Sequence, residues 1–215
     1  MRDFHTAAVI NDKMYIFGGR GTESPFNLYV PGKEIYCNNL WFLDLQTNEW
    51  HRPHTIGTPP TGRRSHSAFV HNNKMYIFGG YNALFVEHYN DMFEFNPVTL
   101  EWKMMNPLGK APCNRRRQAC IVSGDRLFLF GGTSPVSFFP GAQEQFDGDN
   151  IDDQLIDHSD MHILDFHPSL KTLCMLTVRK YKLDTSSLPH CLKVEYKNMF
   201  SPNKITINRP NNSAG

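Results

Sequence analysis

The sequence predicts an all-β fold of about three repeated four-stranded sheets, followed by a short α-helical tail. Internal repetition is the first observation that predicts it, because a similar segment ending in two glycines occurs three times. The glycine pairs begin at Gly18, Gly79 and Gly131, which are 61 and 52 residues apart. The second observation is the chemistry before each pair, where aromatic and β-branched residues are typical of strands.

Each unit is predicted to contain four short strands. In the first unit, Thr6–Ile10 is a strand of small and apolar residues, and the turn at Asn11–Asp12 leads into an aromatic strand that ends at the glycines. After a variable loop, Asn39–Leu45 alternates in parts, and the turn at Gln46–Asn48 precedes a short strand with Trp50. One such sheet has two apolar faces, so the units are expected to stack around an axis.

The later units keep the same order of elements. Trp102 follows Asn96 by six residues, as Trp50 follows Asp44. The tryptophan is expected to supply the apolar surface that one sheet needs against the next. Two complete units are predicted, at about residues 2–54 and 63–106, and a third unit beginning near Arg115.

Composition excludes several classes of protein. The 215 residues are 40% hydrophobic, which excludes general disorder, and the formal charge of +1 argues against nucleic-acid binding. No stretch approaches the roughly 18 apolar residues of a membrane span. The five cysteines are scattered without a C-x-x-C pair, as in reduced proteins of the cytoplasm and nucleus. The ten histidines show no metal-binding spacing, so neither a metal nor a cofactor is expected.

The double glycine followed by spaced aromatic residues resembles the kelch repeat. This resemblance implies one β-propeller blade for each unit of about 50 residues, and propellers close with about four to eight blades. Residues 1–168 are therefore expected to form a partial propeller. We expect the chain to be the C-terminal part of a longer propeller or a truncated gene model.

Further motifs resemble a family of kelch-repeat substrate receptors of cullin-2 ubiquitin ligases. They are Arg63–Phe69, Tyr76–Ala83, Phe130–Pro135, Asp157–Phe166 and Pro168–Cys174. The resemblance implies a non-catalytic protein that captures targets ending in glycine and reaches cullin-2 through elongins B and C. The alternative is a kelch interaction scaffold, cytoskeletal or chromatin-associated, without elongin binding. Propeller enzymes of the galactose-oxidase type need a copper site of Tyr, His and Cys, which the sequence does not suggest.

A terminal carboxylate is an anion that arginine forks and hydroxyl or backbone donors hold well. In kelch propellers, the residue after the glycine pair and those before the first strand surround one mouth of the channel. The degron-binding residues expected there are Arg20, Arg64, Ser65, Tyr81, Arg116 and Arg117. By resemblance, Arg20 matches the carboxylate-binding arginine of the family, whereas Tyr81 is expected to pack at the rim. Arg63 and Arg115 are expected to brace neighbouring blades, and His5 and His66 to cap turns or line the core edge.

Residues 169–200 are expected to be a helical segment that binds elongin and cullin. Leu170, Cys174 and Val178 have the spacing of the family's elongin-binding helix and would share one face. In a competing register, Ser169–Leu173 is a last strand and the helix begins near Leu176; helix over residues 177–183 is common to both. Leu176 therefore also belongs to the expected elongin contacts. A third interpretation is a helix that only closes the propeller.

The remaining predictions concern the C-terminal region and an acidic loop. Leu188, Pro189 and Leu192 resemble the motif that selects cullin-2. Residues 201–215 are predicted to be a disordered tail, and Gly215 is expected to allow self-association by occupying the glycine pocket. The acidic stretch 141–160 is predicted to be a solvated insertion, not a calcium site.

Overall fold

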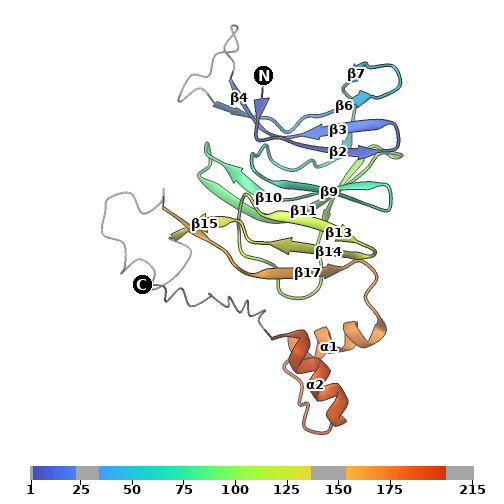
Figure 1. Cartoon of the computed structure of the whole chain (residues 1–215), viewed down its shortest axis with the longest axis vertical. Coiled ribbons are helices and arrows are strands. Elements are labelled where there is room, and N and C mark those ends of the chain that lie inside the picture. The colour runs from blue at the N-terminus through green and yellow to red at the C-terminus, as the bar shows by residue number, and fades with distance from the viewer. Residues whose placement is uncertain (1, 23–33, 137–153, 202–215) are drawn as a thin grey trace, which may run out of the picture.

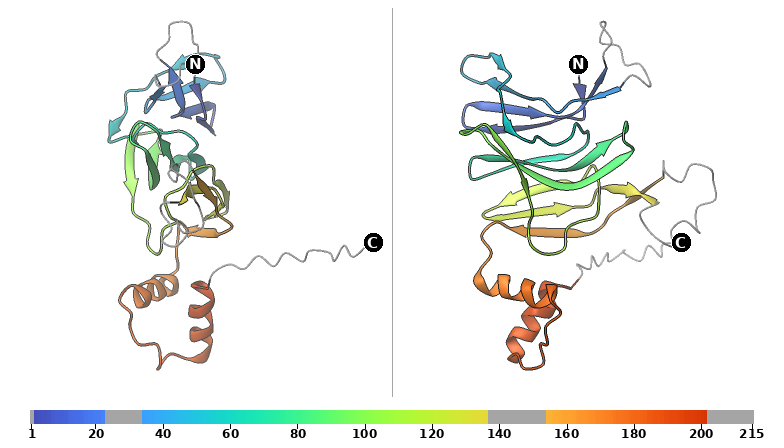
Figure 2. Two further views of the ribbon diagram at one scale, coloured as in Figure 1. Left: turned by 90° about the vertical axis from the view of Figure 1, so that its left-hand side faces the viewer. Right: turned by 180° about the vertical axis from the view of Figure 1, so that it is seen from behind.

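The structure is a computed structural model that describes residues 2–22, 34–136 and 154–201. Three antiparallel sheets follow one another along the chain and stack face to face, and two helices extend from the last sheet (Figure 1). Figure 2 shows the same stacking from the side and from behind. The predicted all-β fold with a helical tail is confirmed.

The strands of these three sheets occupy the predicted repeats. The first sheet has the order β2 (Thr6–Ile10), β3 (Lys13–Phe17), β6 (Leu40–Asp44) and β7 (Trp50–His51). The second has the order β9 (Ser67–His71), β10 (Lys74–Asn82), β11 (Glu87–Asn96) and β12 (Glu101–Met105), with β8 (Ile56–Gly57) parallel to β12. The third contains β13 (Ala119–Ser123), β14 (Arg126–Phe130) and β17 (Met161–Asp165).

Each repeat continues beyond its glycine pair into a second, shorter ladder. In the first repeat the strands are β1 (Arg2–Asp3), β4 (Arg20–Thr22) and β5 (Glu34–Tyr36), and in the third they are β15 (Thr133–Pro135) and β16 (Leu155–Asp157). In the second repeat, β10 and β11 themselves run on after a register shift between Phe78 and Gly80.

The second glycine of each pair allows a close backbone approach. Gly80 has φ +106°, and a Cβ placed on it would lie 2.9 Å from the carbonyl oxygen of Arg64. Gly19 and Gly132 meet the carbonyl oxygens of Asp3 and Arg116 in the same way, at 2.8 Å. A side chain at these positions would collide with the backbone segment that precedes the first strand of the same repeat, so glycine is needed for the two segments to lie together.

Two apolar clusters join the sheets. The cluster between the first and second sheets includes Phe17, Phe95 and the buried Trp102, whose ring lies 5.2 Å from that of Phe17. The cluster between the second and third includes Phe78 and Leu127. Trp102 therefore has the predicted packing role. Trp50 differs, because its side chain is 52% exposed. Trp50 pairs with Leu43, which lies on the opposite face of β6 from Phe42, a residue packed in the first cluster. Trp50 therefore faces away from the second sheet.

The tail contains α1 (Leu170–Lys180) and α2 (His190–Met199). Ser169 caps α1, since its Oγ accepts a hydrogen bond from the Thr172 N–H at 3.1 Å. The alternative of a strand at Ser169–Leu173 is therefore wrong, and among the described residues the third sheet has three strands. The helix ends at Lys180, before the predicted limit of 183. Neither helix in the described part of the chain is long and apolar enough to span a membrane.

Two sequence predictions fall wholly or partly outside the described residues. These are the C-terminal tail with Gly215 and residues 141–153 of the acidic stretch. The described end of that stretch corrects the prediction, because Leu155–Asp157 forms β16 and the Asp160 carboxylate, although 43% exposed, is not free. It forms an ion pair with the fully buried Arg115.

Candidate functional site

Three arginines occupy the same place in the three repeats. Each donates an Nη1 hydrogen bond to the carbonyl of the first glycine of its own pair: Arg2 to Gly18 at 3.2 Å, Arg63 to Gly79 at 3.1 Å and Arg115 to Gly131 at 2.8 Å. These bonds hold the chain before each first strand against the glycine turn of the same repeat. The position therefore serves the fold in all three repeats.

Arg63 and Arg115 are fully buried and each is paired with a carboxylate. Arg63 bonds both oxygens of Asp91, with Nη2 2.9 Å from Oδ2, and its guanidinium lies 4.0 Å from the centre of the Tyr89 ring. Arg115 bonds Asp160 at 2.6 and 2.8 Å, and this pairing holds the pKa of the Asp160 carboxyl well below its usual range. Both arginines thus pair with a carboxylate and a backbone carbonyl as predicted, but these partners lie in the arginine's own repeat, so the side chains brace their own sheets and not neighbouring ones.

The next two positions of each repeat form a continuous edge, which we call the rim. Asp3, Arg64 and Arg116 pair through their backbones with Arg20, Tyr81 and Thr133, the residues that follow the glycine pairs. Phe4, Ser65 and Arg117 come next, and all three have left-handed backbones, with φ of 54°, 56° and 63°. The Ser65 N–H bonds the Phe4 carbonyl at 3.1 Å, and the Arg117 N–H bonds the Ser65 carbonyl at 2.9 Å. The three repeats thus present equivalent positions side by side, and left-handed backbone at non-glycine residues is strain that concentrates at functional sites.

Aromatic rings separate the guanidinium groups along the rim. The Arg64 guanidinium lies 5.8, 5.9 and 5.5 Å from the centres of the Phe4, Tyr36 and Tyr81 rings. The Arg116 guanidinium lies 4.5 Å from the centre of the same Tyr81 ring. Tyr81 therefore packs between two cations, where ring faces favour positive charge.

Three arginines of the rim have no counter-charge beside them in the part of the chain that the structure describes. No carboxylate of the described residues lies within ion-pair distance of Arg64, Arg116 or Arg117. Burial, followed by repulsion from Arg117 and Arg64, lowers the pKa of Arg116. Burial and the charges of Arg116 and Arg64 lower the pKa of His88 to about 4, so this histidine is neutral at pH 7. The site therefore favours binding of an anion.

One donor on the rim has a particularly clear need for an acceptor. The Nε of Arg116 is buried and has no hydrogen-bond partner in the part of the chain that the structure describes. A buried donor without a partner costs about 1–3 kcal/mol, and more when the group is charged. A carboxylate would recover that cost after a side-chain movement that exposes this nitrogen, which has almost no accessible surface as it stands.

Arg20 lies on the rim in a different environment. Its Nη2 is 2.7 Å from Asp3 Oδ2 and its Nη1 is 3.3 Å from Glu34 Oε1, so its charge is already compensated. Its guanidinium lies 5.4 Å from the Phe4 ring, which Arg64 also approaches. The structure thus brings Arg20 beside the other predicted residues but places two acidic groups on it.

Sequence reasoning predicted Tyr81 but missed two other aromatic residues of the rim, Phe4 and Tyr36. Phe4 and Tyr36 flank Arg64, and burial, followed by the hydrogen bond to Glu34, raises the pKa of Tyr36 to about 12. Phe4 could have been found by its alignment with Ser65, whereas Tyr36 lies after a variable loop and carried no repeat signal. A hollow of about 310 Å³ lies elsewhere, beside β6, and is lined by Asn39, Arg52 and His54 among others but by none of the predicted residues.

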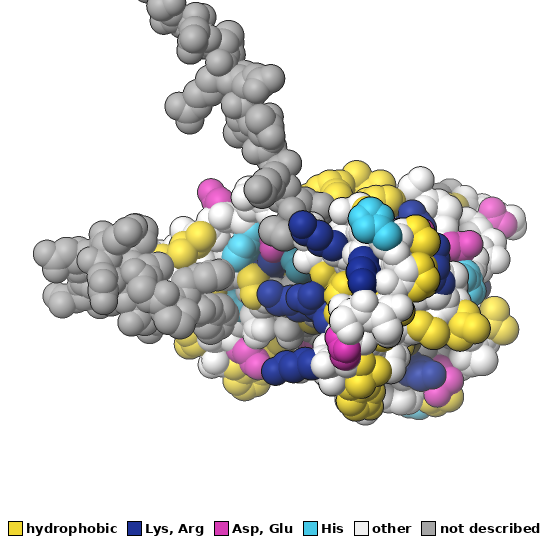
Figure 3. All heavy atoms as spheres, turned by 90° about the horizontal axis from the view of Figure 1, so that it is seen from below, with side chains coloured by type: hydrophobic (Ala, Val, Ile, Leu, Met, Phe, Trp, Pro, Cys, Tyr) yellow, Lys and Arg dark blue, Asp and Glu magenta, His cyan; other side chains and the backbone are white. Residues whose placement is uncertain are grey.

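The helical tail presents a second candidate surface. Leu170, Cys174 and Val178 follow one another by four residues along α1, and Leu170 is 78% exposed. Leu176 lies on another side of α1, close to Gly109 in the connection after β12. A Cβ built on Gly109 would lie 3.4 Å from Leu176 Cδ2. Figure 3, which views the molecule from the helical end, shows apolar side chains exposed among lysines and arginines. Neither helix has a buried residue.

The predicted cullin-binding residues lie at the start of α2. Pro189 is the N-cap of α2, and Leu188 and Leu192 are half-buried. The ion pair of Lys171 Nζ with Glu195 Oε2, at 2.7 Å, links the two helices. The two short apolar motifs therefore belong to one helical unit.

Comparison with known proteins identifies related sequences. Residues 1–132 match the profile described as the KLHDC2/KLHL20/DRC7 Kelch-repeats domain. The chain is 48% identical over 210 residues to Kelch domain-containing protein 3 of Homo sapiens and 49% identical over 206 residues to that of Mus musculus, covering 95% of this chain and 51% of each relative. Host cell factor 2 of Homo sapiens is 30% identical over 142 residues, or 61% of this chain and 17% of that protein. The chain thus spans about half the length of the first two relatives.

A solved structure shows the same fold. The structure of YjhT aligns with a TM-score of 0.54 and 21% identity, covering 78% of this chain and 49% of the other.

Proposed function

The chain belongs to the kelch-repeat family, and from this premise we propose that it is a substrate-recognition subunit of a cullin-2 ubiquitin ligase that binds proteins ending in glycine. Kelch repeats and the similarity to Kelch domain-containing protein 3 support a role in protein interaction. Beyond this general role, we propose the ligand (a C-terminal glycine), the cullin-2 ligase and a location in the cytoplasm and nucleus. The chain itself would position the target, and catalysis would take place on partner subunits.

The observation that carries the proposal is the rim. Arg64, Arg116 and Arg117 gather there without carboxylate partners among the described residues, and Arg116 Nε lacks an acceptor. A C-terminal carboxylate has two oxygens, and a planar guanidinium can bond both of them. The Ser65 hydroxyl would add a donor for the captured chain end, because the Ser65 N–H is already bonded to the Phe4 carbonyl.

The helical tail supports the second half of the proposal. The face of α1 with Leu170, Cys174 and Val178 would contact elongin C, and elongin B would join through elongin C. The expected contact of Leu176 is not part of this proposal, because Leu176 lies on another side of α1, near Gly109. Leu188, Pro189 and Leu192 would contact cullin-2. An apolar helix face that lies open is a common means of docking into a hydrophobic groove.

Binding of matched peptides tests the ligand. Fluorescently labelled peptides ending in free glycine, amidated glycine or aspartate would be titrated with the full chain. We expect measurable affinity for free glycine and its loss on amidation, because amidation removes the anion. Arg116→Gln should weaken binding by roughly tenfold or more, since a charged hydrogen bond contributes about 1.5–3 kcal/mol.

Arg126→Gln is the matched control, because Arg126 is an exposed arginine on β14 that pairs with Asp165 away from the rim. It should leave peptide affinity unchanged. Equal affinity for free and amidated glycine, or equal effects of the two substitutions, would contradict the carboxylate-binding role.

Elongin capture separates this proposal from a kelch scaffold. Elongins B and C should co-purify with the full chain, and a charged residue at Cys174 should abolish this. Failure of both elongins to bind would favour the scaffold, even if glycine-ended peptides bind.

A further inference from the structure

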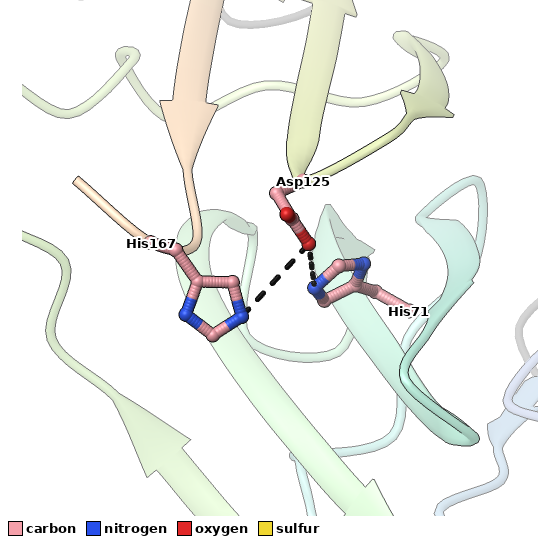
Figure 4. A group of neighbouring side chains, drawn as sticks. All are labelled: His71, Asp125 and His167. Carbon is pink, nitrogen blue, oxygen red and sulfur yellow. Dashed lines mark ion pairs between the residues drawn. The ribbon is translucent and has the colours of Figure 1, made fainter. Parts of the chain in front are cut away.

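Three metal-ligating side chains meet at the edge where the second and third sheets lie together. His71 is the last residue of β9, Asp125 lies in the turn between β13 and β14, and His167 follows β17 (Figure 4). One ligand atom from each residue lies within 4.8 Å of the others. In Figure 4 both imidazole rings point toward the Asp125 carboxylate.

The distances suit an ion between the side chains better than direct hydrogen bonds. Asp125 Oδ1 lies 3.5 Å from His71 Nε2 and 3.8 Å from His167 Nε2. Hydrogen bonds between such atoms are about 2.7–3.2 Å long. Zinc bonds to nitrogen and oxygen are about 2.0–2.2 Å, which places tetrahedral ligand atoms about 3.3–3.5 Å apart. A small movement of the exposed His167 would bring all three atoms to that spacing.

The surrounding structure holds these ligands in place. The buried His71 ring stacks on Phe166 at 4.1 Å with an interplanar angle of 16°. The Phe166 N–H donates to the Asp125 carbonyl at 2.9 Å, which fixes the chain before His167 beside the turn that carries Asp125. The Nδ2 of Asn72 lies 3.1 Å from His71 Nε2 and donates to it, so this nitrogen is unprotonated, as in a histidine that binds a metal. Because an imidazole nitrogen has one lone pair, zinc would displace this amide from His71 Nε2.

We propose that His71, Asp125 and His167 form a zinc site that joins the second sheet to the third and to the segment leading into α1. Two imidazoles and one carboxylate favour zinc over magnesium or calcium, which prefer oxygen ligands. Three protein ligands leave a fourth position for water. The site lies on a different edge from the rim and is independent of the proposed peptide binding.

Metal titration of the full chain tests the site. Metal-free protein would be titrated with zinc chloride or magnesium chloride while its thermal midpoint is measured, and cobalt binding would be followed by visible absorption. We expect zinc, but not magnesium, to raise the midpoint, because an ion that binds only the folded chain stabilises it. The cobalt spectrum should lack the charge-transfer bands of cysteine ligands.

Asp125→Asn and His167→Asn are the informative variants, because both side chains are exposed and their loss should not disturb the metal-free fold. Each should weaken zinc affinity by roughly tenfold or more. His54→Asn changes an exposed histidine outside the cluster and should have no effect. No rise in the midpoint with zinc, or wild-type zinc affinity in both ligand variants, would overturn the proposal.

Discussion

Replacing His66 with glutamine is expected to remove part of the sensitivity of the fold to acid. The His66 ring is buried between the first two sheets, with Nε2 2.6 Å from Thr6 Oγ1 and its ring edge-on to Phe17 at 5.6 Å. Burial, followed by the charge of Arg63, lowers the pKa of His66 to about 3. In the unfolded chain the pKa of a histidine is about 6.5.

The sign follows from these two pKa values. As pH falls below about 6.5, the unfolded state takes up a proton at His66 that the folded state does not accept until about pH 3. Stability present above pH 6.5 is therefore lost as pH falls through this window. At about pH 5 the loss from this one residue is about 2 kcal/mol.

Glutamine is the appropriate replacement because the third repeat already has it. Gln118 occupies the equivalent position, is buried and donates from Nε2 to the Phe78 carbonyl at 2.9 Å. Glutamine does not titrate, so His66→Gln should keep the fold and lose only the pH-dependent term. Any constant cost, such as the lost bond to Thr6, cancels when two pH values are compared.

Urea unfolding near pH 7.5 and near pH 5 measures this difference. The free energy of unfolding should fall by about 2 kcal/mol less in His66→Gln than in the wild type between these conditions. His88 titrates in both proteins and does not affect the comparison. His5→Gln, a change at the exposed equivalent in the first repeat, is the control and should behave like the wild type. An equal fall in wild type and His66→Gln would refute the assigned pKa.

Three further predictions concern packing and docking. Arg63→Met should lower the free energy of unfolding by roughly 3 kcal/mol or more, because it leaves Asp91 without its buried partner; a urea titration showing under about 1 kcal/mol would contradict the bracing role. Trp102→Ala should cost about 3–5 kcal/mol in the same assay, whereas Trp50→Ala should cost roughly 1 kcal/mol or less; similar costs would contradict their different burial. Cys174→Arg should abolish elongin capture in a pull-down while glycine-peptide affinity stays unchanged, and retained capture would exclude this face of α1.

The strands of the repeats could be predicted from the sequence, because neighbouring residues along the chain determine them. The strand at Thr6–Ile10 has those bounds in the structure, and the aromatic strands before each glycine pair all form. Alternation of side chains and turn residues at fixed offsets determine such strands within a few residues. The same repeat register placed Arg63 and Arg115 at equivalent positions.

Pairings between distant segments could not be predicted in this way. Asp160 looked like one of several solvated carboxylates, and only the fold brings it to Arg115. The helix at Leu170 was ambiguous because its apolar residues fit two periodicities; the Ser169 cap and the contact of Leu176 near Gly109 favour the helical arrangement. His71 and His167 showed no metal spacing because they come from different sheets.

The repeats themselves separate structural residues from candidate binding residues within this one chain. The position just before the rim is arginine in all three repeats, namely Arg2, Arg63 and Arg115. Each donates the same hydrogen bond to a glycine carbonyl, which is what we expect of a residue that the fold requires. The following position is aspartate, arginine and arginine, and the one after it is phenylalanine, serine and arginine, although the backbone at each is equivalent. The backbone does not require these differences in side chain, and their effect is on the charge of the rim. The positive charge of Arg20 is compensated by acidic side chains, whereas the positive charges of Arg64, Arg116 and Arg117 are not compensated by any described residue. A carboxylate ligand should therefore contact the second and third repeats more closely than the first.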